Sequence, residues 1–457
     1  MFLKLSKLFI WIALFSVLIV LLGTFFPFIG GKYYFFRVAV ELALASFLIW
    51  WAFEASANSL KQLFTPILEN PLFIAVSVFV ATFLLASIFA YDTHAAFWSN
   101  YERGEGGFQM LHYYIFFVLA TVLFREWSDW RLTFRASLVA ASGVILYGVA
   151  SAARIGNFIG ASQNIPANTS FWDLLLGPRF QGTLGNPAYV APYLLFILFF
   201  GAYLWSQSKI KNHWLKHLLY GGLSLFLLFF FTLSKTRGGF LGLGAGIAVF
   251  FGYLIWTAPK LRKWLIGTLV GLVLILGALF MNRHTEFVHS LPISRIFELT
   301  FSEQTVQTRL WTWGSAWKGF KERPILGWGP ENFSTVFDLH FDPRHFVPGQ
   351  NSETWFDRAH SVVFDYLAEI GLIGFLAYVS MFATFYFLFF KFFIKPKHHK
   401  NSTTQILVGH ALLLAMPVAY LVQALALFDV LPIYLNLFLL LSFAIFIFNK
   451  HSHATNS

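Results

Sequence analysis

Long, almost unbroken apolar runs dominate this chain of 457 residues and constrain its fold more than any other feature. Hydrophobic residues make up 58% of the sequence and charged residues 12%, the composition of a protein embedded in lipid. A helix needs about 20 apolar residues to cross a hydrocarbon core of about 30 Å. About twelve runs predict spans, near 8–28, 35–53, 71–90, 109–124, 132–152, 188–205, 216–234, 238–257, 264–281, 364–393, 406–428 and 431–448.

The runs predict an all-α polytopic membrane protein. Backbone groups in lipid must bond within a helix or a closed barrel, and these runs lack the alternation of barrel strands. We expect a single integral domain over 1–457, with the first run as an uncleaved span. One large outer loop, 282–363, lies between the ninth and tenth spans, and the tail 451–457 is predicted to be disordered.

Lysine and arginine in the connections predict the orientation. Positive charge is held on the cytoplasmic side, and the connections near Lys4, Lys61, Lys209, Lys260 and Lys395 are rich in it. Both termini are then cytoplasmic, and the alternate connections face outward. The net charge of +11 follows from this topology, so it does not indicate a nucleic-acid partner.

Several outward connections nevertheless carry arginine, against the positive-inside rule. Arg103, Arg179, Arg237 and Arg309 are far apart in sequence, but the same face of the bilayer would gather them. Together with His360 they predict a pocket for a doubly phosphorylated lipid. Arginine offers planar bidentate bonds to phosphate, and charged groups near membrane depth are usually functional.

Each of these positions has an alternative interpretation. Arg103, between Glu102 and Glu105, is also compatible with a solvated interfacial loop. Asn186 precedes a span, where free helix amides favour anions, but a simple N-cap explains it equally well. For Lys235 and Arg237, which lie in a very short turn, we favour a functional role over snorkelling. The glycines after Arg237 indicate close helix packing rather than a phosphate loop.

His360 lies where the large loop becomes a span. Histidine can accept a proton near neutral pH, and attack by a sugar hydroxyl requires removal of its proton. The alternative is that His360 is an ordinary polar residue at the membrane interface. Asp357, Asp365 and Glu369 are candidate partners for the ring, and the sequence does not choose among them.

The large loop contains an apolar stripe with helical spacing. Val306, Leu310, Trp313, Trp317 and Phe320 recur at intervals of four and three, and Pro324 ends the pattern. Tryptophan favours the headgroup level, so we expect an amphipathic helix on the membrane surface, with Arg309 at the edge of its stripe.

Taken in order, these motifs resemble those of the O-antigen ligase superfamily of membrane glycosyltransferases. The similar segments are KTRGG, the R-x-x-x-W-x-x-A run from Arg309, PILGWGPENF and AHS to EIGLIG, with RFQGTLGNPAYVAPY and FWSNYERGEGG as looser matches. The resemblance implies that Arg237 and Arg309 bind a lipid diphosphate and that His360 activates the acceptor. Arg179 and Asn186 match a less strict position. Ser361 and Ala188 depart from residues that are often asparagine in the family, which affects the acceptor contacts.

The predicted function is therefore transfer of a glycan from a polyprenyl diphosphate to an acceptor hydroxyl, with inversion at the anomeric carbon. We expect a bacterial inner-membrane enzyme of the O-antigen ligase type with an outward-facing site and with no cofactor or metal, because arginines are plentiful and a DxD-type carboxylate pair is absent. The diphosphate-binding residues are Arg237, Arg309, Arg179, Arg103 and Lys235, and Asn186 and Asp357 support them.

Ligation to lipid A–core or a similar acceptor is the first interpretation. Repeat-unit polymerisation and protein O-glycosylation are alternatives, and an anion transporter is the alternative of another class. The main candidate for an intramembrane ion pair, Arg37 with Glu41 in the second span, is expected to be structural rather than conductive, and the other cations gather at one surface, which favours an enzyme. Sugar, acceptor and oligomeric state stay open.

Overall fold

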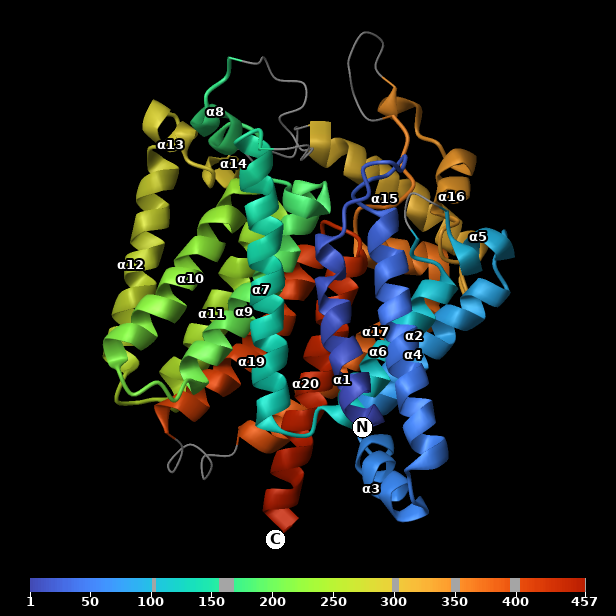
Figure 1. Ribbon diagram of the computed structural model, residues 1–457. Coiled ribbons are helices and arrows are strands. Elements are labelled where there is room, and N and C mark those ends of the chain that lie inside the picture. Colours follow the sequence, from blue (N-terminus) through green and yellow to red (C-terminus); the bar gives the residue numbers. More distant parts are fainter. Residues whose placement is uncertain (101–103, 156–167, 298–303, 347–353, 395–402, 457) are drawn as a thin grey trace. The chain divides into compact units, whose positions relative to one another are not determined.

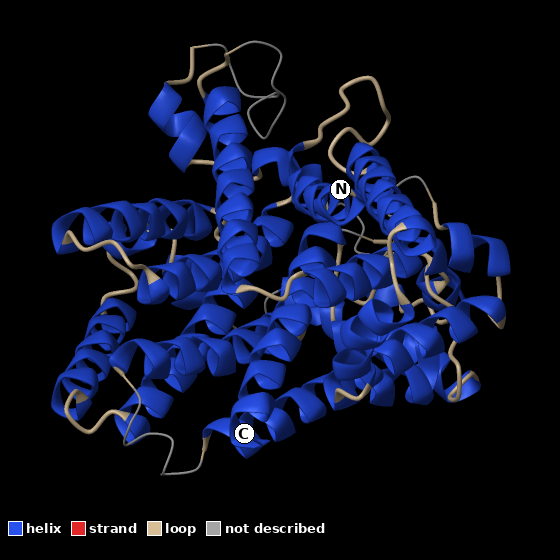
Figure 2. Ribbon diagram, turned by 60° about the horizontal axis from the view of Figure 1, so that its bottom comes forward, coloured by secondary structure: helices blue, strands red, loops and turns tan. Residues whose placement is uncertain are grey.

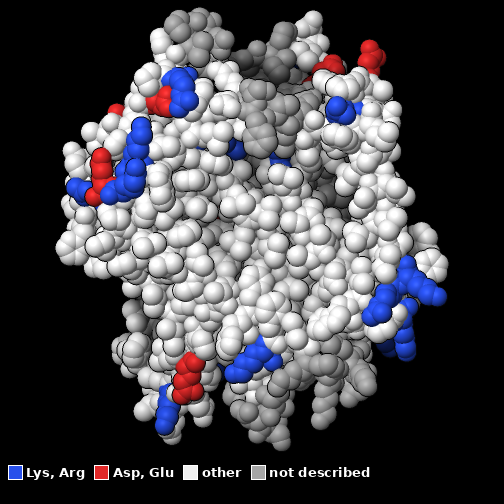
Figure 3. Space-filling view, turned by 180° about the vertical axis from the view of Figure 1, so that it is seen from behind, with Lys and Arg blue, Asp and Glu red and all other residues white. Residues whose placement is uncertain are grey.

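The computed structural model describes residues 1–457 except 101–103, 156–167, 298–303, 347–353, 395–402 and 457. In this described part the regular secondary structure is helical, and no strand occurs (Figure 2). Uncharged side chains cover most of the face shown in Figure 3, where Lys, Arg, Asp and Glu form only a few small groups. The protein has an all-α polytopic membrane fold, as the apolar runs predict.

Ten helices of the described residues are long and apolar enough to cross a bilayer. The helix α6 (Gly107–Leu123) is also apolar but shorter. Most of the ten long helices begin and end close to the bounds predicted from the apolar runs. The ten are α2 (Gly30–Phe53), α4 (Pro71–Ile88), α7 (Trp127–Ala152), α9 (Pro187–Gln207), α10 (His213–Leu233), α11 (Arg237–Thr257), α12 (Arg262–Met281), α17 (Val362–Phe393), α19 (Thr404–Ala424) and α20 (Leu431–Asn456).

The first predicted span, 8–28, is wrong as a continuous helix. Helix α1 (Phe2–Ala13) passes into the 3-10 turn η1 (Leu14–Leu18), and the chain is extended at Ile19. Residues 21–28 form turns that contain Gly23 and Pro27, two residues that disfavour helix. The Lys32 ammonium donates to the Ile19 carbonyl at 2.6 Å and so binds a main-chain oxygen at the end of the helix.

The last helix is longer than predicted. Helix α20 extends to Asn456, so most of the segment 451–457, which we expected to be disordered, is helical. Extension of an existing helix adds one hydrogen bond for each residue fixed, which is why a polar tail continues a long apolar helix readily.

The chain divides into two compact units. The first unit comprises Met1–Trp130, Thr300–Leu388 and Ala424–Ser457, and the second comprises Arg131–Leu299 and Phe389–Gln423. The single integral domain stays a prediction. In the first unit, α1 packs along α2, and α6 contacts α2, α4 and α20 (Figure 1).

The second unit is built around α9, most of which is buried. Helix α10 packs on α9, and α11 contacts both α9 and α12 (Figure 1). The glycines of α11 allow this packing, as predicted: a Cβ on Gly239 would lie 2.7 Å from the Ala191 methyl, and one on Gly246 would lie 2.9 Å from the Ala419 methyl.

Helix α17 is interrupted at Gly371, in its N-terminal third. Gly371 has φ 65° and ψ −170°, a conformation that essentially only glycine adopts. The segment 324–329 fills the break with main-chain hydrogen bonds. Leu372 N–H donates to Pro324 at 2.8 Å, and Trp328 N–H and Gly329 N–H donate to Ala368 and Glu369 at 2.9 and 2.7 Å. The glycine-rich PILGWG motif therefore satisfies backbone groups that a continuous helix would bond itself.

The large loop contains the predicted helix, α15 (Gln304–Glu322). The residues of the predicted apolar stripe are not the ones that this helix buries. The buried side is formed by small residues, Thr308, Thr312, Ser315, Ala316 and Gly319. A Cβ on Gly319 would lie 2.2 Å from the Val336 side chain of α16 (Phe333–Leu339), so only small residues permit this contact. Leu310 and Trp317 are exposed, as a helix on the membrane surface requires. The location at the membrane surface stays a prediction.

Candidate functional site

Four cationic side chains gather at one end of the second unit, where α10 ends and α11 begins. Arg179 donates to the Ser234 carbonyl at 3.1 Å and to the Thr236 hydroxyl at 3.0 Å. Lys235 donates to the carbonyls of Leu176 and Gly177 at 2.9 and 2.7 Å. These bonds attach the GPRF segment to the SKTR turn. We name Arg179, Lys235, Arg237 and Arg295 the cationic cluster.

Arg295 completes the cluster from the large loop. Its guanidinium donates to the Lys235 carbonyl at 3.3 Å, and its own carbonyl accepts a hydrogen bond from Arg237 at 2.7 Å. The sequence analysis did not identify Arg295, because no pattern distinguishes the SRIF segment from other polar parts of the loop. The short helix α14 (Ser294–Phe297), which contacts α11, positions it.

The electrostatics of the cluster favour an anion. Burial lowers the pKa of Lys235, and the positive charges of Arg295 and Arg179 lower it further. Lys235 also adopts a positive φ of 49°, which is uncommon for a residue other than glycine. A ligand with two negative phosphates would relieve this repulsion, whereas a neutral ligand would not.

Asn186 is the N-cap of α9. Its side-chain oxygen accepts the Ala188 N–H at 2.8 Å. The N-cap interpretation is therefore confirmed, and the proposed supporting role of Asn186 in binding is an additional hypothesis.

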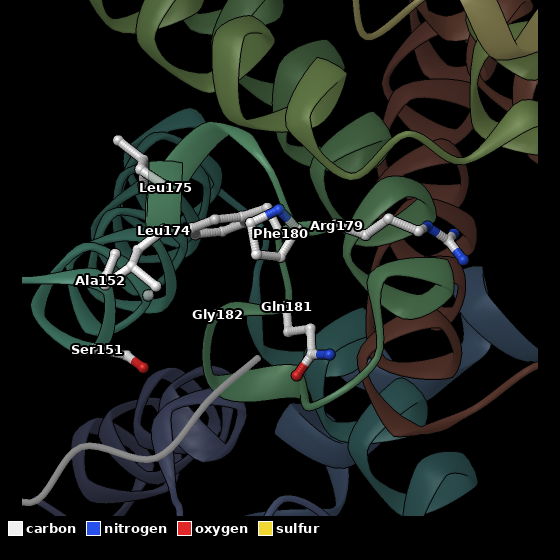
Figure 4. Close-up of a pocket in the computed structure, with 10 residues that line it drawn as sticks. Ser151, Ala152, Leu174, Leu175, Arg179, Phe180, Gln181 and Gly182 are labelled. Atoms are coloured by element: carbon white, nitrogen blue, oxygen red, sulfur yellow. The ribbon is translucent and has the colours of Figure 1, made fainter. Parts of the chain in front are cut away.

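A small cavity adjoins Arg179, between the end of α7, the short helix α8 (Phe171–Leu176) and the 178–182 loop (Figure 4). Figure 4 shows that the Arg179 side chain extends away from Leu174 and Ala152, which line the cavity wall. The volume is about 30 Å³, enough for one water molecule but not for a sugar ring. The cavity is therefore too small to be a binding site for a sugar.

In the first unit, His360 lies in a tightly held turn before α17. Its φ of 54° is left-handed. Both main-chain polar groups of the preceding residue, Ala359, are hydrogen-bonded. Asp365 accepts the Ala359 N–H at 2.6 Å, and the Trp313 indole donates to the Ala359 carbonyl at 2.9 Å. Such an unfavourable conformation persists only where the surroundings hold it.

The contacts of the imidazole define its tautomer. Nδ1 lies 3.1 Å from the Arg358 carbonyl oxygen, which can only accept, so this hydrogen bond requires the proton on Nδ1. Nε2 of the neutral ring then carries the lone pair that a general base needs. The rings of Phe356 and Phe428 stand nearly perpendicular to the imidazole, at 5.4 and 5.2 Å.

Behind this turn, one buried arginine is bound by two carboxylates. Arg358 donates through Nη1 to both oxygens of Glu369, at 2.9 and 2.8 Å, and through Nη2 to Glu331. Glu331 N–H also donates to Glu369 at 3.0 Å, and Glu331 accepts the Ser99 hydroxyl at 2.9 Å. We name Arg358, Glu331 and Glu369 the Arg358 clamp. Of the three candidate partners for His360, Glu369 is therefore bound to Arg358, and Asp365 holds the Ala359 N–H.

A buried acid lies in the same unit, in the connection to α6. Glu105 accepts the hydroxyls of Tyr33 and Tyr113 at 2.8 and 3.0 Å. Burial raises the pKa of Glu105 to about 7, although both tyrosine hydrogen bonds and the charge of Arg358 act in the opposite direction. The ERGEGG motif is therefore partly a folded, buried element rather than only a solvated loop. Arg103 itself lies outside the described residues.

Arg309 is half-buried on α15. It precedes Trp313 by four residues, so both side chains lie on the same helix face, and Trp313 bonds to the turn of His360. Asp357, also half-buried, immediately precedes Arg358 in that turn.

The predicted Arg37–Glu41 pair is wrong. Arg37 donates to Gln109 at 2.7 Å and to the Gly104 carbonyl at 3.3 Å, whereas Glu41 lies 3.0 Å from His112. Both residues of α2 thus bond to α6 and its preceding connection instead of to each other, because packing between helices offers each a closer partner than the helix surface does.

In the first unit, Trp313 of α15, the helix that carries Arg309, bonds to the turn that contains Asp357 and His360. In the second unit, Arg179, Lys235 and Arg237 meet in the cationic cluster, and the Thr236 hydroxyl donates to the carbonyl of Pro187, the residue after Asn186. The Arg358 clamp was missed by sequence reasoning. Its only sequence signal was the density of charged residues around DRAHS. The sequence does not show that this arginine will pair with two glutamates of other segments.

Comparison with known families adds an independent finding. Residues 222–379 match the model of the family Wzy_C, described as O-antigen ligase. The match begins in α10 and ends in α17, so it contains Arg237, Arg295, Arg309, the Arg358 clamp and His360. No curated protein matches the chain. The match over residues 222–379 supports the resemblance of this chain to the O-antigen ligase superfamily.

Proposed function

We propose that the protein transfers a glycan from a polyprenyl-diphosphate carrier to an acceptor hydroxyl, with lipid A–core or a similar molecule as the acceptor. The observation that carries this proposal is the cationic cluster: four cationic side chains, contributed by three connections distant in sequence, meet at the ends of α10 and α11. A diphosphate leaving group develops charge as its bond breaks, and arginine stabilises that charge with planar, bidentate hydrogen bonds.

An apolar groove in the same unit supports a lipid-linked donor. It has a volume of about 520 Å³ and is lined by α9, α10, α11 and Leu412 of α19, with Phe199, Leu228 and Ile247 among its residues. Leu228 precedes Lys235 by seven residues, roughly 10 Å along a helix axis. A polyprenyl chain whose diphosphate binds the cationic cluster can therefore enter the groove.

In the proposed reaction the acceptor oxygen attacks the anomeric carbon of the donor. The new carbon–oxygen bond forms as the bond to the diphosphate breaks, and the electron pair leaves with the polyprenyl diphosphate. The acceptor proton passes to Nε2 of His360, the nitrogen left unprotonated by the bond from Nδ1 to Arg358. Direct displacement inverts the anomeric configuration. Arg309 and Arg103 are proposed to assist in binding the donor, and Asp357 and Asn186 to support the site.

The proposal includes a location. We propose that the chain lies in the inner membrane of a bacterium, with both termini in the cytoplasm and the reaction on the outer face. In the first unit, the contacts of Ser99 with Glu331 and of Tyr33 with Glu105 gather predicted outer segments at one end, in support of this orientation.

Glycan transfer by the purified protein tests the proposal. The donor is a polyprenyl-diphosphate-linked oligosaccharide, and separate reactions contain lipid A–core, excess donor or a serine-containing peptide as the acceptor. Product size then distinguishes ligation, polymerisation and protein glycosylation, and released polyprenyl diphosphate measures the rate. Uptake of the donor or of inorganic diphosphate by vesicles without transfer would support a transporter instead.

Two substitutions identify the site. Arg237→Ala is expected to lower kcat/KM about 100-fold, the usual loss when one stabilising donor is removed. His360→Ala is expected to lower kcat by a factor of about 100 to 10,000. The control is Arg344→Gln, which removes an exposed arginine paired with Asp342 in the large loop. Turnover equal to that of the wild type in both Arg237→Ala and His360→Ala would reject the assignment.

A further inference from the structure

A buried charged group directly behind His360 has no part in the reaction proposed above. Arg358 is only 7% exposed, and its guanidinium bonds to Glu369 and Glu331, which belong to two other segments. Burial of three ionisable groups is costly and is often no better for stability than an apolar cluster, so stability alone does not account for the clamp.

The clamp fixes the position of residue 358 from three directions. Glu369 belongs to the segment of α17 before the Gly371 break, and Glu331 follows the PILGWG segment that fills that break. Glu331 is also tied to Ser99, in the connection before α6. A single guanidinium therefore joins the turn of His360 to α17 and to the segment that contains Glu331, which is in turn bonded to Ser99.

The main chain of Arg358 is what His360 uses. The Arg358 carbonyl oxygen accepts a hydrogen bond from Nδ1 of His360, and this bond determines which ring nitrogen carries the proton. If residue 358 moves, the imidazole loses the partner that defines its tautomer. The Ala359 peptide, held by Asp365 and Trp313, does not replace this bond because it contacts the main chain rather than the ring.

We infer that Arg358, held between Glu331 and Glu369, is a positioning residue for the proton-accepting His360. This inference rests on the proposed function of His360. The side chain of Arg358 does not bind the donor; it acts through its own carbonyl on the orientation and tautomer of the imidazole. Lysine cannot replace it, since an ammonium group lacks the fork that bonds both oxygens of one carboxylate while reaching a second.

A double-mutant cycle tests the inference, with the polyprenyl-diphosphate-linked oligosaccharide as the donor and the acceptor that is active in the transfer assay. Arg358→Lys is expected to lower kcat about tenfold or more, because a small displacement of a reacting group has a large effect on rate. KM for the donor is expected to stay within about twofold. In the His360→Ala background, Arg358→Lys is expected to change kcat less than about twofold, since the residue through which it acts is gone.

A purely structural role gives a different result. In that case Arg358→Lys lowers kcat by the same factor with or without His360, and this outcome would overturn the inference. Lys7→Met is the matched control, because it also removes a partly buried ion pair of the first unit, with Asp129 at 2.8 Å. It is expected to reduce thermal stability but to leave the transfer rate unchanged in both backgrounds.

Two further measurements keep the test decisive. Glu331→Gln preserves the shape of the clamp and replaces Arg358→Lys if that variant does not fold. If the rate of His360→Ala is too low to measure, the pH dependence of kcat decides. A shift of its midpoint by about half a pH unit or more in the clamp variant supports the inference, since changed hydrogen bonding alters the base, and an unchanged midpoint rejects it. Undiminished turnover in His360→Ala itself would instead reject the proposed function.

Discussion

Replacement of Gly371 by alanine should displace the 324–329 segment from the break in helix α17 and destabilise the protein. Gly371 has φ 65° and ψ −170°, and a methyl group there would lie 2.4 Å from the Ile325 carbonyl oxygen and 2.6 Å from the Gly327 nitrogen. Both obstacles are main-chain atoms, which cannot rotate away as a side chain can. Ordinary contact begins at 3.4 Å, so the 324–329 segment must move by about 1 Å, the difference between 3.4 and 2.4.

This displacement has a calculable effect on stability. The bonds from Leu372 to Pro324 and from Trp328 to Ala368 are 2.8 and 2.9 Å long, and an additional 1 Å takes them beyond hydrogen-bonding range. Each lost bond costs about 1 kcal/mol, and the backbone conformation costs about 1–3 kcal/mol for a residue other than glycine. Together the terms predict a loss of about 3–5 kcal/mol.

Thermal unfolding of the purified protein in detergent measures this loss. We expect the unfolding temperature of Gly371→Ala to fall by on the order of 10 °C and glycan transfer to fall with it, because Glu369 lies two residues before the break. The matched control is Gly314→Ala on α15, where a new methyl group meets no atom within 4 Å and improves helix propensity by up to about 1 kcal/mol. If Gly371→Ala unfolds at the wild-type temperature or above, the packing of the 324–329 segment against Gly371 does not contribute to stability as argued here.

Three further predictions follow from the site. Because the folded-state pKa of Glu105 is raised from 4.5 to about 7, its contribution to stability is fully present below pH 4.5 and is lost as the pH rises to about 7; Glu105→Gln should therefore remove roughly 3 kcal/mol of the difference in unfolding free energy between pH 4.5 and pH 8, and an unchanged difference would contradict the burial of the acid. Lys235→Met should raise KM for the donor about tenfold, because the cationic cluster loses one charge; the unfolding temperature should change little, since relief of the repulsion by Arg295 and Arg179 offsets the loss of the hydrogen bonds to Leu176 and Gly177, and an unchanged KM would argue against an anion site. Asn186→Ala should cost about 1 kcal/mol in unfolding free energy through loss of the N-cap, with kcat within about twofold of wild type, and a large loss of kcat at unchanged stability would show a direct role in the reaction.

Local sequence determined the helical architecture of this protein. Apolar runs specify helices in lipid through their length alone, so the bounds of α4, α9 and α10 lie within a few residues of the predicted spans. The glycines of α11 were correctly interpreted as packing positions. The exception, the first run, shows the limit of this reasoning: its average hydropathy is that of a span, but the helical segment ends at Leu18 and is followed by turns that contain Gly23 and Pro27.

The arginines illustrate what the pattern of charges can predict. Arg179, Lys235 and Arg237 stood out because they violate the positive-inside rule, and the structure gathers them into one cluster. Arg295 and Arg358 did not stand out, since charged residues are ordinary in a large polar loop. Their partners are 58 to 60 residues away for Arg295 and up to 27 for Arg358, distances over which sequence alone does not show which residues will meet.

The sequence by itself determined that this chain is a helical membrane protein with cationic turns and a histidine at the start of a span, because hydrophobic burial and charge placement act locally along the chain. The break at Gly371, the pairing of Arg358 with Glu331 and Glu369, and the protonation of His360 on Nδ1 follow only from the three-dimensional fold. These features depend on hydrogen bonds between segments far apart in sequence. Such bonds have directions and partners that form only when the chain has folded.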